Sequence, residues 1–245
     1  MDDYGIIGYP LVQSFSKVFF EKKFMDEGVA AAYHLFRLQN INELTDVLEA
    51  RPNLKGFNVT IPYKKQVLPF LHRATDAVTQ MGACNCIKVV NGKLHGFNTD
   101  VTGFQQSLQP LLQPHHSKAL VLGTGGASAA VVFALQTLHI PFLLVSRSAK
   151  NIKNIICYDD ISEEMITEYS LIINATPAGM YPDVEACPDI PYRYLTAKHL
   201  LYDLIYKPDK TLFLQKGEER GCQVKNGYEM LILQAEANWK IWNAD

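Results

Sequence analysis

The stretch Ala119-Leu120-Val121-Leu122-Gly123-Thr124-Gly125-Gly126-Ala127-Ser128 decides the fold class of this chain. Residues 119–122 are typical of a buried parallel strand, and the alanine- and valine-rich residues 128–138 are typical of a helix. A glycine at position 123 permits a tight turn, and one at position 125 lets the backbone approach a pyrophosphate, whose charge the start of a helix attracts. The stretch therefore predicts a dinucleotide site. A purely structural turn is the alternative, because Ser128 stands where the fuller glycine motif ends.

The end of the next expected strand, residues 142–145, bears on which dinucleotide binds. An acidic residue at this point usually bonds the ribose hydroxyls of NAD, and this chain has none there. It has hydroxyls at Ser146 and Ser148 and cations at Arg147 and Lys150, which suit a 2′-phosphate. The pattern therefore predicts NADP rather than NAD, with a solvated basic loop as the alternative.

Composition excludes several other classes of protein. The chain has 245 residues, of which 48% are apolar and 20% charged, as in soluble globular proteins of one or two domains. A net charge of −2 offers no electrostatic attraction to nucleic acid or to an anionic membrane. The longest apolar run, residues 129–135, is far short of the roughly 20 residues that span a bilayer. We therefore expect a cytoplasmic protein, with reduced thiols at its five cysteines and no metal site, that acts on a small molecule.

The chain changes character near residue 115, which indicates two α/β domains. Strand-like patterns fall at residues 4–8, 32–38, 56–61, 86–90, 93–97, 119–122, 142–145, 171–174, 200–204 and 222–225. Helix-like patterns fall between them, at residues 42–50, 99–112, 128–138 and 211–220, and at the end, at residues 227–242. Alternation of this kind favours mainly parallel sheets, with Asn91-Gly92 as a hairpin turn. Residues 147–155 are short for a parallel crossover, so we expect no proper helix there.

Several polar motifs stand at the ends of these expected strands. Residues 56–65 combine Asn58 and Thr60 on one strand face with Lys64 just beyond a proline. The string Asn98-Thr99-Asp100 starts an expected helix, and Ser14 and Ser16 precede another. Taken singly, each motif also fits a helix cap or a solvated lysine. Their order along the chain is the stronger signal.

Taken together, the sequence resembles the shikimate dehydrogenase family almost from end to end. The matching blocks are Ser14-x-Ser16, residues 56–64, residues 82–85, Asn98-Thr99-Asp100, residues 123–127, residues 174–180, residues 203–208 and Asn226-Gly227-x-x-Met230-Leu231-x-x-Gln234-Ala235. The resemblance implies a substrate domain of residues 1–103 plus 227–245, a Rossmann-like doubly wound NADP-binding domain of residues 104–226, and a site between them. The implied reaction is the reversible NADPH-dependent reduction of 3-dehydroshikimate to shikimate, in aromatic amino acid biosynthesis.

The resemblance also implies roles for individual residues. Lys64 and Asp100 would be the catalytic pair that handles the proton, with Lys64 as proton donor or mainly as an orienting group. The substrate carboxylate would meet Ser14, Ser16 and Tyr206, and its ring hydroxyls would meet Asn58, Thr60, Asn85 and Gln234. The cofactor would contact Gly123, Gly125, Gly126, Ala127, Ser146, Arg147, Ser148, Lys150, Thr176, Ala178, Met180 and Gly227.

This chain departs from the family pattern at Lys17, Cys86 and Val101, where proline, threonine and glycine are usual. Cys86 and Val101 would lie near the ring of the substrate. A quinate or dual quinate/shikimate dehydrogenase is therefore an alternative, and a non-catalytic NADP-binding regulator on the same scaffold is another. A methylene-tetrahydrofolate dehydrogenase fits less well, because of the paired serines and the Asn58-Val59-Thr60 string. We expect a monomer or a homodimer.

Overall fold

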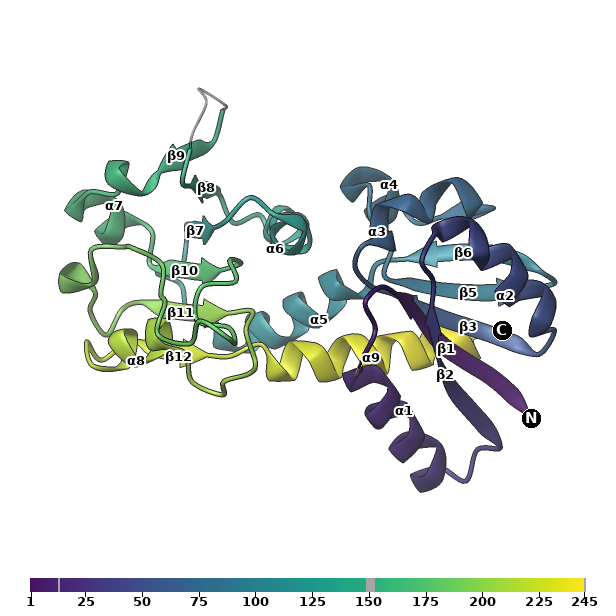
Figure 1. Ribbon diagram of the computed structural model, residues 1–245. Coiled ribbons are helices and arrows are strands. Elements are labelled where there is room, and N and C mark those ends of the chain that lie inside the picture. The colour runs from purple at the N-terminus through teal and green to yellow at the C-terminus, as the bar shows by residue number, and fades with distance from the viewer. Residues whose placement is uncertain (13, 149–152, 245) are drawn as a thin grey trace. The chain divides into compact units, whose positions relative to one another are not determined.

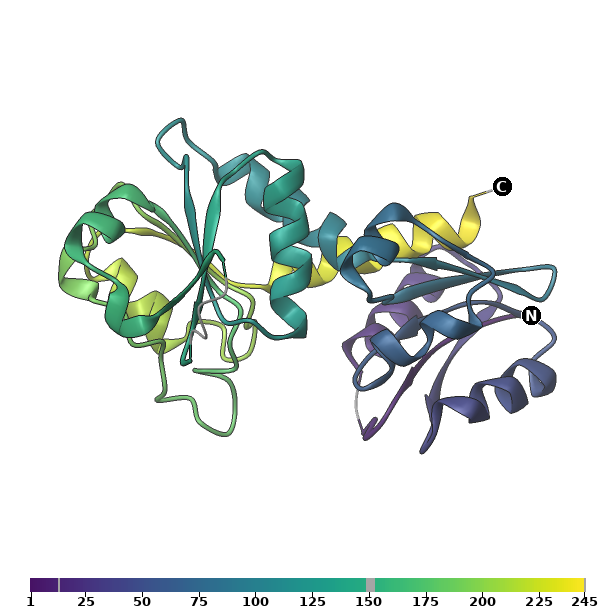
Figure 2. The ribbon, with the colours of Figure 1, turned by 90° about the horizontal axis from the view of Figure 1, so that it is seen from above.

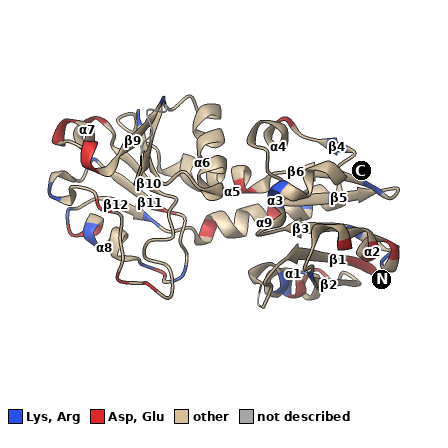
Figure 3. Ribbon diagram, turned by 45° about the horizontal axis from the view of Figure 1, so that its top comes forward, with Lys and Arg blue, Asp and Glu red and all other residues tan. Residues whose placement is uncertain are grey.

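The computed structural model describes residues 1–12, 14–148 and 153–244. The chain forms two compact units, of which unit 1 comprises Met1–Asp100 and Gln234–Asp245, and unit 2 comprises Val101–Leu233. Each unit contains a six-stranded sheet with helices packed on it (Figure 1). Among the described residues, no helix combines the length and the apolar character that crossing a membrane requires. Basic and acidic residues are interspersed in each unit, as the small net charge suggests (Figure 3).

The sheet of unit 1 has the strand order β2-β1-β3-β5-β6-β4. Its strands are β1 (Asp2–Gly8), β2 (Ala31–Arg37), β3 (Leu54–Val59), β4 (Arg73–Ala74), β5 (Cys86–Val90) and β6 (Lys93–Phe97). Strand β1 pairs in parallel with β2 and β3, and β4 pairs in parallel with β6, whereas β5 is antiparallel to both of its neighbours. The β5–β6 hairpin turns at Asn91 and Gly92, both of which have positive φ, as the predicted two-residue turn requires.

Helices cover both faces of this sheet. They are α1 (Phe15–Asp26), α2 (Leu44–Ala50), α3 (Tyr63–Gln66), α4 (Asp76–Met81), the start of α5 (Thr99–Leu108) and the end of α9 (Tyr228–Asn243), with short 3-10 turns at Ile41–Glu43 and Leu68–Phe70. Alternate residues of β1 enter different cores, since Tyr4 and Ile6 pack in an aromatic cluster with α1 and α9, whereas Ile7 packs in the opposite cluster. The α9 residue Trp242 lies so close to Gly56 that a Cβ there would come within 2.3 Å of its ring.

The sheet of unit 2 has the strand order β12-β11-β10-β7-β8-β9, and all of its pairs are parallel. Its strands are β7 (Ala119–Leu122), β8 (Phe142–Ser146), β9 (Ile155–Cys157), β10 (Leu171–Asn174), β11 (Leu200–Asp203) and β12 (Gln223–Lys225). This is the doubly wound order of dinucleotide-binding domains, in which ligands bind at the carboxyl ends of the strands, where the order reverses. Here the order reverses between β7 and β10.

The two faces of this sheet are covered by different helices (Figure 2). Helix α6 (Gly126–Thr137) and α5 lie on one face, where Phe104 of α5 meets Tyr202 of β11 edge-on at 5.0 Å. Helices α7 (Glu163–Glu168) and α8 (Leu212–Glu218) lie on the other, where Ile166 and Phe213 pack on Leu120 of β7. Both faces are therefore buried, which explains the continuous apolar runs of the inner strands, such as Ala119–Leu122 in β7.

Some element boundaries differ from those expected. Helix α5 ends at Leu108 and gives way to a 3-10 turn at Gln109–Leu111, because Pro110 disfavours helical backbone in the residue before it. Helix α6 begins at Gly126, two residues before its expected start. The short strand β9 and helix α7 were not anticipated. Of the short crossover between β8 and β9, the described residues 147–148 and 153–154 form bends and turns.

Candidate functional site

Lys64 and Asp100 form an ion pair in unit 1, with 2.7 Å between Nζ and Oδ2. Lys64 stands on α3, directly after β3, and Asp100 stands in the first turn of α5, directly after β6. Both side chains are half-buried, at 35% and 22% exposure. The backbone N–H of Cys84 donates to the Lys64 carbonyl at 2.8 Å and fixes the base of the lysine. An ammonium that is anchored by a carboxylate and still reaches solvent can bind a ligand oxygen and give it a proton.

Buried amides and hydroxyls form a hydrogen-bonded chain in the same unit. The Tyr33 hydroxyl donates to Asn58 Oδ1 at 2.7 Å, and Asn58 Nδ2 donates to the Asn85 carbonyl at 3.3 Å. The Ser16 hydroxyl bonds to the Tyr33 hydroxyl. Burial raises the pKa of Tyr33 well above its ordinary value, and the bond from Ser16 opposes this shift. Tyr33 thus stays protonated and links two predicted substrate residues.

A second run of bonds joins Asn85 to Gln234. Asn85 Oδ1 accepts from the Thr99 N–H at 2.7 Å, and the Thr99 hydroxyl donates to Asn238 Oδ1 at 2.6 Å. Asn238 Nδ2 then donates to Gln234 Oε1 at 3.2 Å. All four side chains are buried. Three predicted residues of unit 1, Asn58, Asn85 and Gln234, therefore belong to one buried polar network.

The two remaining predicted substrate residues of unit 1 are Ser14, directly before α1, and Thr60, directly after β3. Ser14 occupies the N-cap position of α1, yet its side chain makes no capping hydrogen bond within the described chain. The Thr60 N–H donates to the Ile7 carbonyl at 3.0 Å, and its methyl lies against Gly8, where a Cβ would come within 2.5 Å. Capping of α1 therefore does not account for the Ser14 hydroxyl.

The departures from the family pattern have local structural roles. Lys17 donates from Nζ to the Tyr33 carbonyl at 2.9 Å and pairs with Glu21, so it ties α1 to β2. Cys86 is fully buried in the aromatic cluster, and burial raises its thiol pKa well above the ordinary value. Val101 is buried as well.

In unit 2, the glycine turn after β7 has the geometry that its sequence predicts. Gly123 has a φ of +105°, and a Cβ there would come within 2.9 Å of the Thr176 methyl. By contrast, a Cβ at Gly125 or Gly126 would meet no described heavy atom within 4 Å. The Ser128 hydroxyl turns back to donate to the Gly125 carbonyl at 2.6 Å. The first glycine is thus required by the fold, whereas the next two leave the start of α6 open to a ligand.

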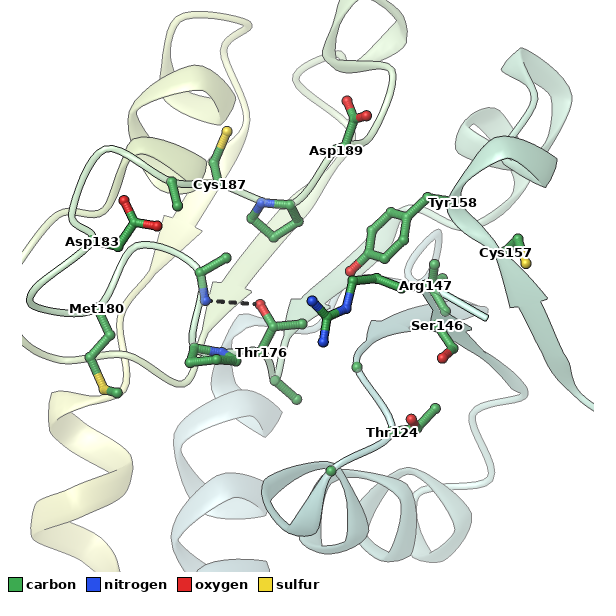
Figure 4. Close-up of a pocket in the computed structure, with 18 of the residues that line it drawn as sticks. Thr124, Ser146, Arg147, Cys157, Tyr158, Thr176, Met180, Asp183, Cys187 and Asp189 are labelled. Carbon is green, nitrogen blue, oxygen red and sulfur yellow. Dashed lines mark hydrogen bonds between the residues drawn. The ribbon is translucent and has the colours of Figure 1, made fainter. Parts of the chain in front are cut away.

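A cavity of about 930 Å³ opens at this turn, at the carboxyl ends of β7, β8, β9 and β10 (Figure 4). Of the predicted cofactor residues it is lined by Gly123, Gly125, Ser146, Arg147, Thr176, Ala178 and Met180. The predicted residues Gly126, Ala127, Ser148 and Gly227 are not in its lining, and Lys150 lies outside the described residues. A volume near 1,000 Å³ suits a large ligand such as a dinucleotide.

Sequence reasoning missed the wall that β9 supplies. Cys157, Tyr158 and Asp159 line the cavity, and the Tyr158 hydroxyl lies beside the Arg147 guanidinium (Figure 4). Burial raises the pKa of Tyr158; Arg147 opposes this shift and Asp189 adds to it. The signal that could have revealed these residues is their place at the end of β9, but the three residues of that strand are too few for a recognisable strand pattern.

A buried carboxylate holds the loops on one side of this cavity. Asp203, at the end of β11, accepts from the Thr211 hydroxyl at 2.6 Å and from Ile205 N and Asn174 Nδ2 at 3.0 Å each. Asn174 Oδ1 in turn accepts from the hydroxyl of Thr176, a lining residue, at 2.6 Å. Burial raises the pKa of Asp203 to about 6, although these hydrogen bonds lower it.

The remaining predicted residues, Tyr206 and Gly227, lie in unit 2 beyond β11 and β12. Tyr206 is exposed. The Gly227 N–H donates to the Ile205 carbonyl at 3.1 Å, and a Cβ at Gly227 would come within 2.1 Å of the Leu204 carbonyl oxygen. The close backbone approach accounts for a glycine at this position.

The fold and the strand-end cavity define a class: two-unit α/β proteins in which one unit is a Rossmann-like, dinucleotide-binding domain. Residues 6–87 match the family model described as shikimate dehydrogenase substrate binding domain. A shikimate dehydrogenase (NADP(+)) of Desulforamulus reducens is 33% identical over 259 residues, covering 97% of this chain and 88% of the relative. The chain therefore belongs to the shikimate dehydrogenase family.

Solved structures agree with this family membership. A shikimate 5-dehydrogenase of Thermus thermophilus in complex with NADP(H) and shikimate is 29% identical, with a TM-score of 0.86 over 99% of this chain and 94% of that one. A quinate dehydrogenase of Corynebacterium glutamicum in complex with NAD is 26% identical, with a TM-score of 0.88 over 99% and 93%. The family scaffold is thus similar in proteins named for either substrate.

Proposed function

We propose that this chain catalyses the reversible, NADP-dependent interconversion of shikimate and 3-dehydroshikimate, with unit 1 as the substrate domain and unit 2 as the cofactor domain. The observation that carries the proposal is the Lys64–Asp100 pair at 2.7 Å, set among buried amides and hydroxyls. When bound, NADPH would supply the hydride that the ketone carbon takes up. The oxygen then needs a proton, and Lys64 Nζ gives it one while Asp100 holds the ammonium in place.

The substrate residues of unit 1 are neutral polar groups, which suits a ring that carries several hydroxyls. Asn58, Asn85 and Gln234 bind these hydroxyls in directions that the buried network sets, and Thr60 contributes a hydroxyl from the end of β3. A site built to bond hydroxyls strongly rejects analogues that lack them. Ser14 and Ser16 bind the substrate carboxylate, and Tyr206 assists them.

The cofactor residues of unit 2 divide between pyrophosphate and 2′-phosphate. The open start of α6 at Gly125 and Gly126, continued by Ala127, binds the pyrophosphate. Arg147 lines the cavity with its guanidinium inside it, and binds the 2′-phosphate together with Ser146, Ser148 and Lys150. This arrangement favours NADP over NAD.

A quinate or dual-specificity enzyme is the second candidate. Quinate carries one more ring hydroxyl, and the chain has Cys86 and Val101 where the family usually has threonine and glycine. Both are buried, so they alter the packing behind the ring site rather than its charge. The presence of Arg147 in the cavity favours NADP as the cofactor, and hence shikimate as the substrate.

We place the protein in the cytoplasm, as a monomer or a homodimer that binds neither nucleic acid nor membrane. The five cysteines, each within the described residues, form no disulfide bond with one another, as expected in a reducing compartment. The net charge of −2 supports the absence of a polyanionic partner.

The test is an assay of the purified protein with shikimate or quinate and with NADP or NAD, followed by the absorbance of the reduced cofactor. We expect activity with shikimate and NADP to exceed the other three combinations by at least about tenfold. Comparable rates with quinate establish the dual-specificity alternative. Inactivity in all four, with NADP still bound, establishes the non-catalytic regulator instead.

A further inference from the structure

Two buried residues without an assigned role, Thr99 and Asn238, lie between two of the proposed substrate residues, Asn85 and Gln234. Thr99 is 1% exposed and Asn238 is 0% exposed. Thr99 begins α5, and Asn238 stands one turn after Gln234 on α9. Their side chains connect the loop that precedes β5 to the last helix of the chain.

One backbone group and one short contact together set the direction of the bonds in this run. The Thr99 N–H can act only as a donor, so the atom that it meets at 2.7 Å must be the oxygen of the Asn85 amide. The other end of that amide, Nδ2, therefore donates to the Thr99 hydroxyl at 3.1 Å. The hydroxyl has one proton, which goes to Asn238 Oδ1 at 2.6 Å rather than to the more distant Asn85 Oδ1 at 3.2 Å.

The same logic reaches Gln234. Because Asn238 Oδ1 accepts from Thr99, its Nδ2 faces Gln234 and donates to Oε1 at 3.2 Å. An amide carries its oxygen and its NH₂ on opposite sides, so the Nε2 group of Gln234 is turned away from Asn238. The backbone donor thus fixes the Asn85 amide, and the 2.6 Å contact, which is short for an N–H donor and ordinary between a hydroxyl and an oxygen, fixes the Asn238 amide.

We infer that Asn238 and Thr99 are positioning residues that hold Gln234 with its NH₂ group presented to the substrate as a donor. The inference rests on the proposed function, in which Gln234 binds a ring hydroxyl. A ring hydroxyl of the substrate that contacts Gln234 must then accept a hydrogen bond from the NH₂ group. The proton of that hydroxyl is donated to a different partner. We call the hydrogen-bonded run from Asn85 through Thr99 and Asn238 to Gln234 the relay. The relay thus selects the orientation of the ring as well as the presence of a hydroxyl.

The kinetic test uses Asn238→Leu, which removes both bonds at similar volume, alone and combined with Gln234→Ala. We expect Asn238→Leu to raise the KM for shikimate about tenfold, while kcat and the KM for NADP change less than about twofold. In the Gln234→Ala background the same substitution should change the KM for shikimate less than about twofold. An equal increase in both backgrounds, or none in either, overturns the inference, because Asn238 would then act otherwise than through Gln234.

A second pair of variants keeps the test sharp if Asn238→Leu folds poorly. Thr99→Val breaks the relay at its other end and should reproduce the higher KM, whereas Thr99→Ser keeps the hydroxyl and should restore the parental value. Ser107→Ala is the matched control, because it removes an equally buried hydroxyl that bonds Tyr202 outside the network. If Thr99→Ser is as impaired as Thr99→Val, the inference fails.

A measurement without turnover separates this inference from the proposed function. In ¹⁵N-labelled protein, the side-chain amide signal of Gln234 is identified by its loss in Gln234→Ala. We expect its exchange with solvent to be at least about tenfold faster in Asn238→Leu than in the parent. Equal exchange overturns the relay, whereas failure of the parent to bind or oxidise shikimate overturns the proposed function.

Discussion

The two units prepare their sites in different ways. In unit 1, hydrogen bonds orient the individual side chains of the site. The amides of Asn58, Asn85 and Gln234 are each oriented by a neighbouring residue, and the Lys64 ammonium is paired with a carboxylate. In unit 2, the backbone forms the site, since a glycine turn and strand-end loops surround an open cavity of about 930 Å³. The contrast separates two needs: a small ring must be held at one orientation, whereas a long cofactor is gripped at several points. Single side-chain changes should therefore abolish function in unit 1 and only weaken binding in unit 2.

Loss of Lys64 should give the largest effect. We expect Lys64→Ala to lower kcat by about 10²–10⁴-fold, because no group then holds the transferred proton. Calorimetric affinity for shikimate should change only severalfold, since the amide network remains. Lys65→Ala, one residue further along α3 and exposed, is the control and should keep parental kcat. A parental rate for Lys64→Ala would remove the catalytic assignment.

The buried Asp203 carboxylate should make unit 2 sensitive to pH. Its pKa is about 6 in the folded chain against an ordinary value of 3.8, so ionisation costs folding free energy. That contribution to stability is fully present below about pH 4 and is lost as the pH rises through about 6. The difference in unfolding free energy between Asp203→Asn and the parent should therefore shift by about 2 kcal/mol in favour of the variant between pH 4 and pH 7. Urea unfolding of both proteins at the two pH values measures it, and a constant difference contradicts the prediction.

Arg147 should affect affinity and cofactor choice rather than rate. We expect Arg147→Ala to weaken NADP binding about 10- to 100-fold and NAD binding less than about threefold, because only NADP carries the 2′-phosphate. Calorimetric titration with both cofactors measures the ratio. Arg193→Ala is a suitable control, since that guanidinium stacks on Tyr194 at 4.5 Å and does not line the cavity. An equal loss for NADP and NAD would show that Arg147 does not recognise the 2′-phosphate.

The smallest effect on stability should come from Gly126→Ala. Its Cβ meets nothing within 4 Å among the described atoms, and alanine favours the helix, so the unfolding free energy should rise by up to about 1 kcal/mol. NADP affinity should nevertheless fall, because the added methyl takes space beside the phosphate. Gly123→Ala provides the contrast: its φ of +105° and its contact with Thr176 should make it destabilising. Stability loss in both variants would mean that the turn is a purely structural one.

Local patterns in the sequence predicted much of the fold. Strands β7 and β10 have the expected limits, because a short apolar run, of four residues in β7 and of three before Asn174 in β10, leads directly into a turn in each case. The Asn91-Gly92 turn was also predicted from a local pattern, since both residues tolerate positive φ. Strand β9 could not be found, because Ile155–Cys157 is too short to show a period.

The candidate site was less accessible to the same reasoning. The motifs marked Lys64 and Asp100, and Thr99 stands in the second of them, where it also fits a helix cap; Tyr33 and Asn238, which orient the site as well, carry no local signal. Each acts through a partner at a distance in the chain, as Thr99 does across 139 positions to Asn238. Whether a buried amide has a partner depends on the packing of several elements, which no short stretch of sequence encodes.

The last turns of α9 complete the core of unit 1. During synthesis on the ribosome, the earlier part of that core is therefore made and exposed before the residues that cover it. Tyr4, Phe20 and Phe24 pack against Trp239 and Trp242, which emerge only after the whole of unit 2 has been made. At 5–20 residues per second, the intervening Val101–Leu233 takes roughly 7 to 27 s to translate. Unit 2 is continuous in the chain and can fold during that interval. A chain that stalls before residue 234 therefore offers chaperones a bare aromatic face on its first unit.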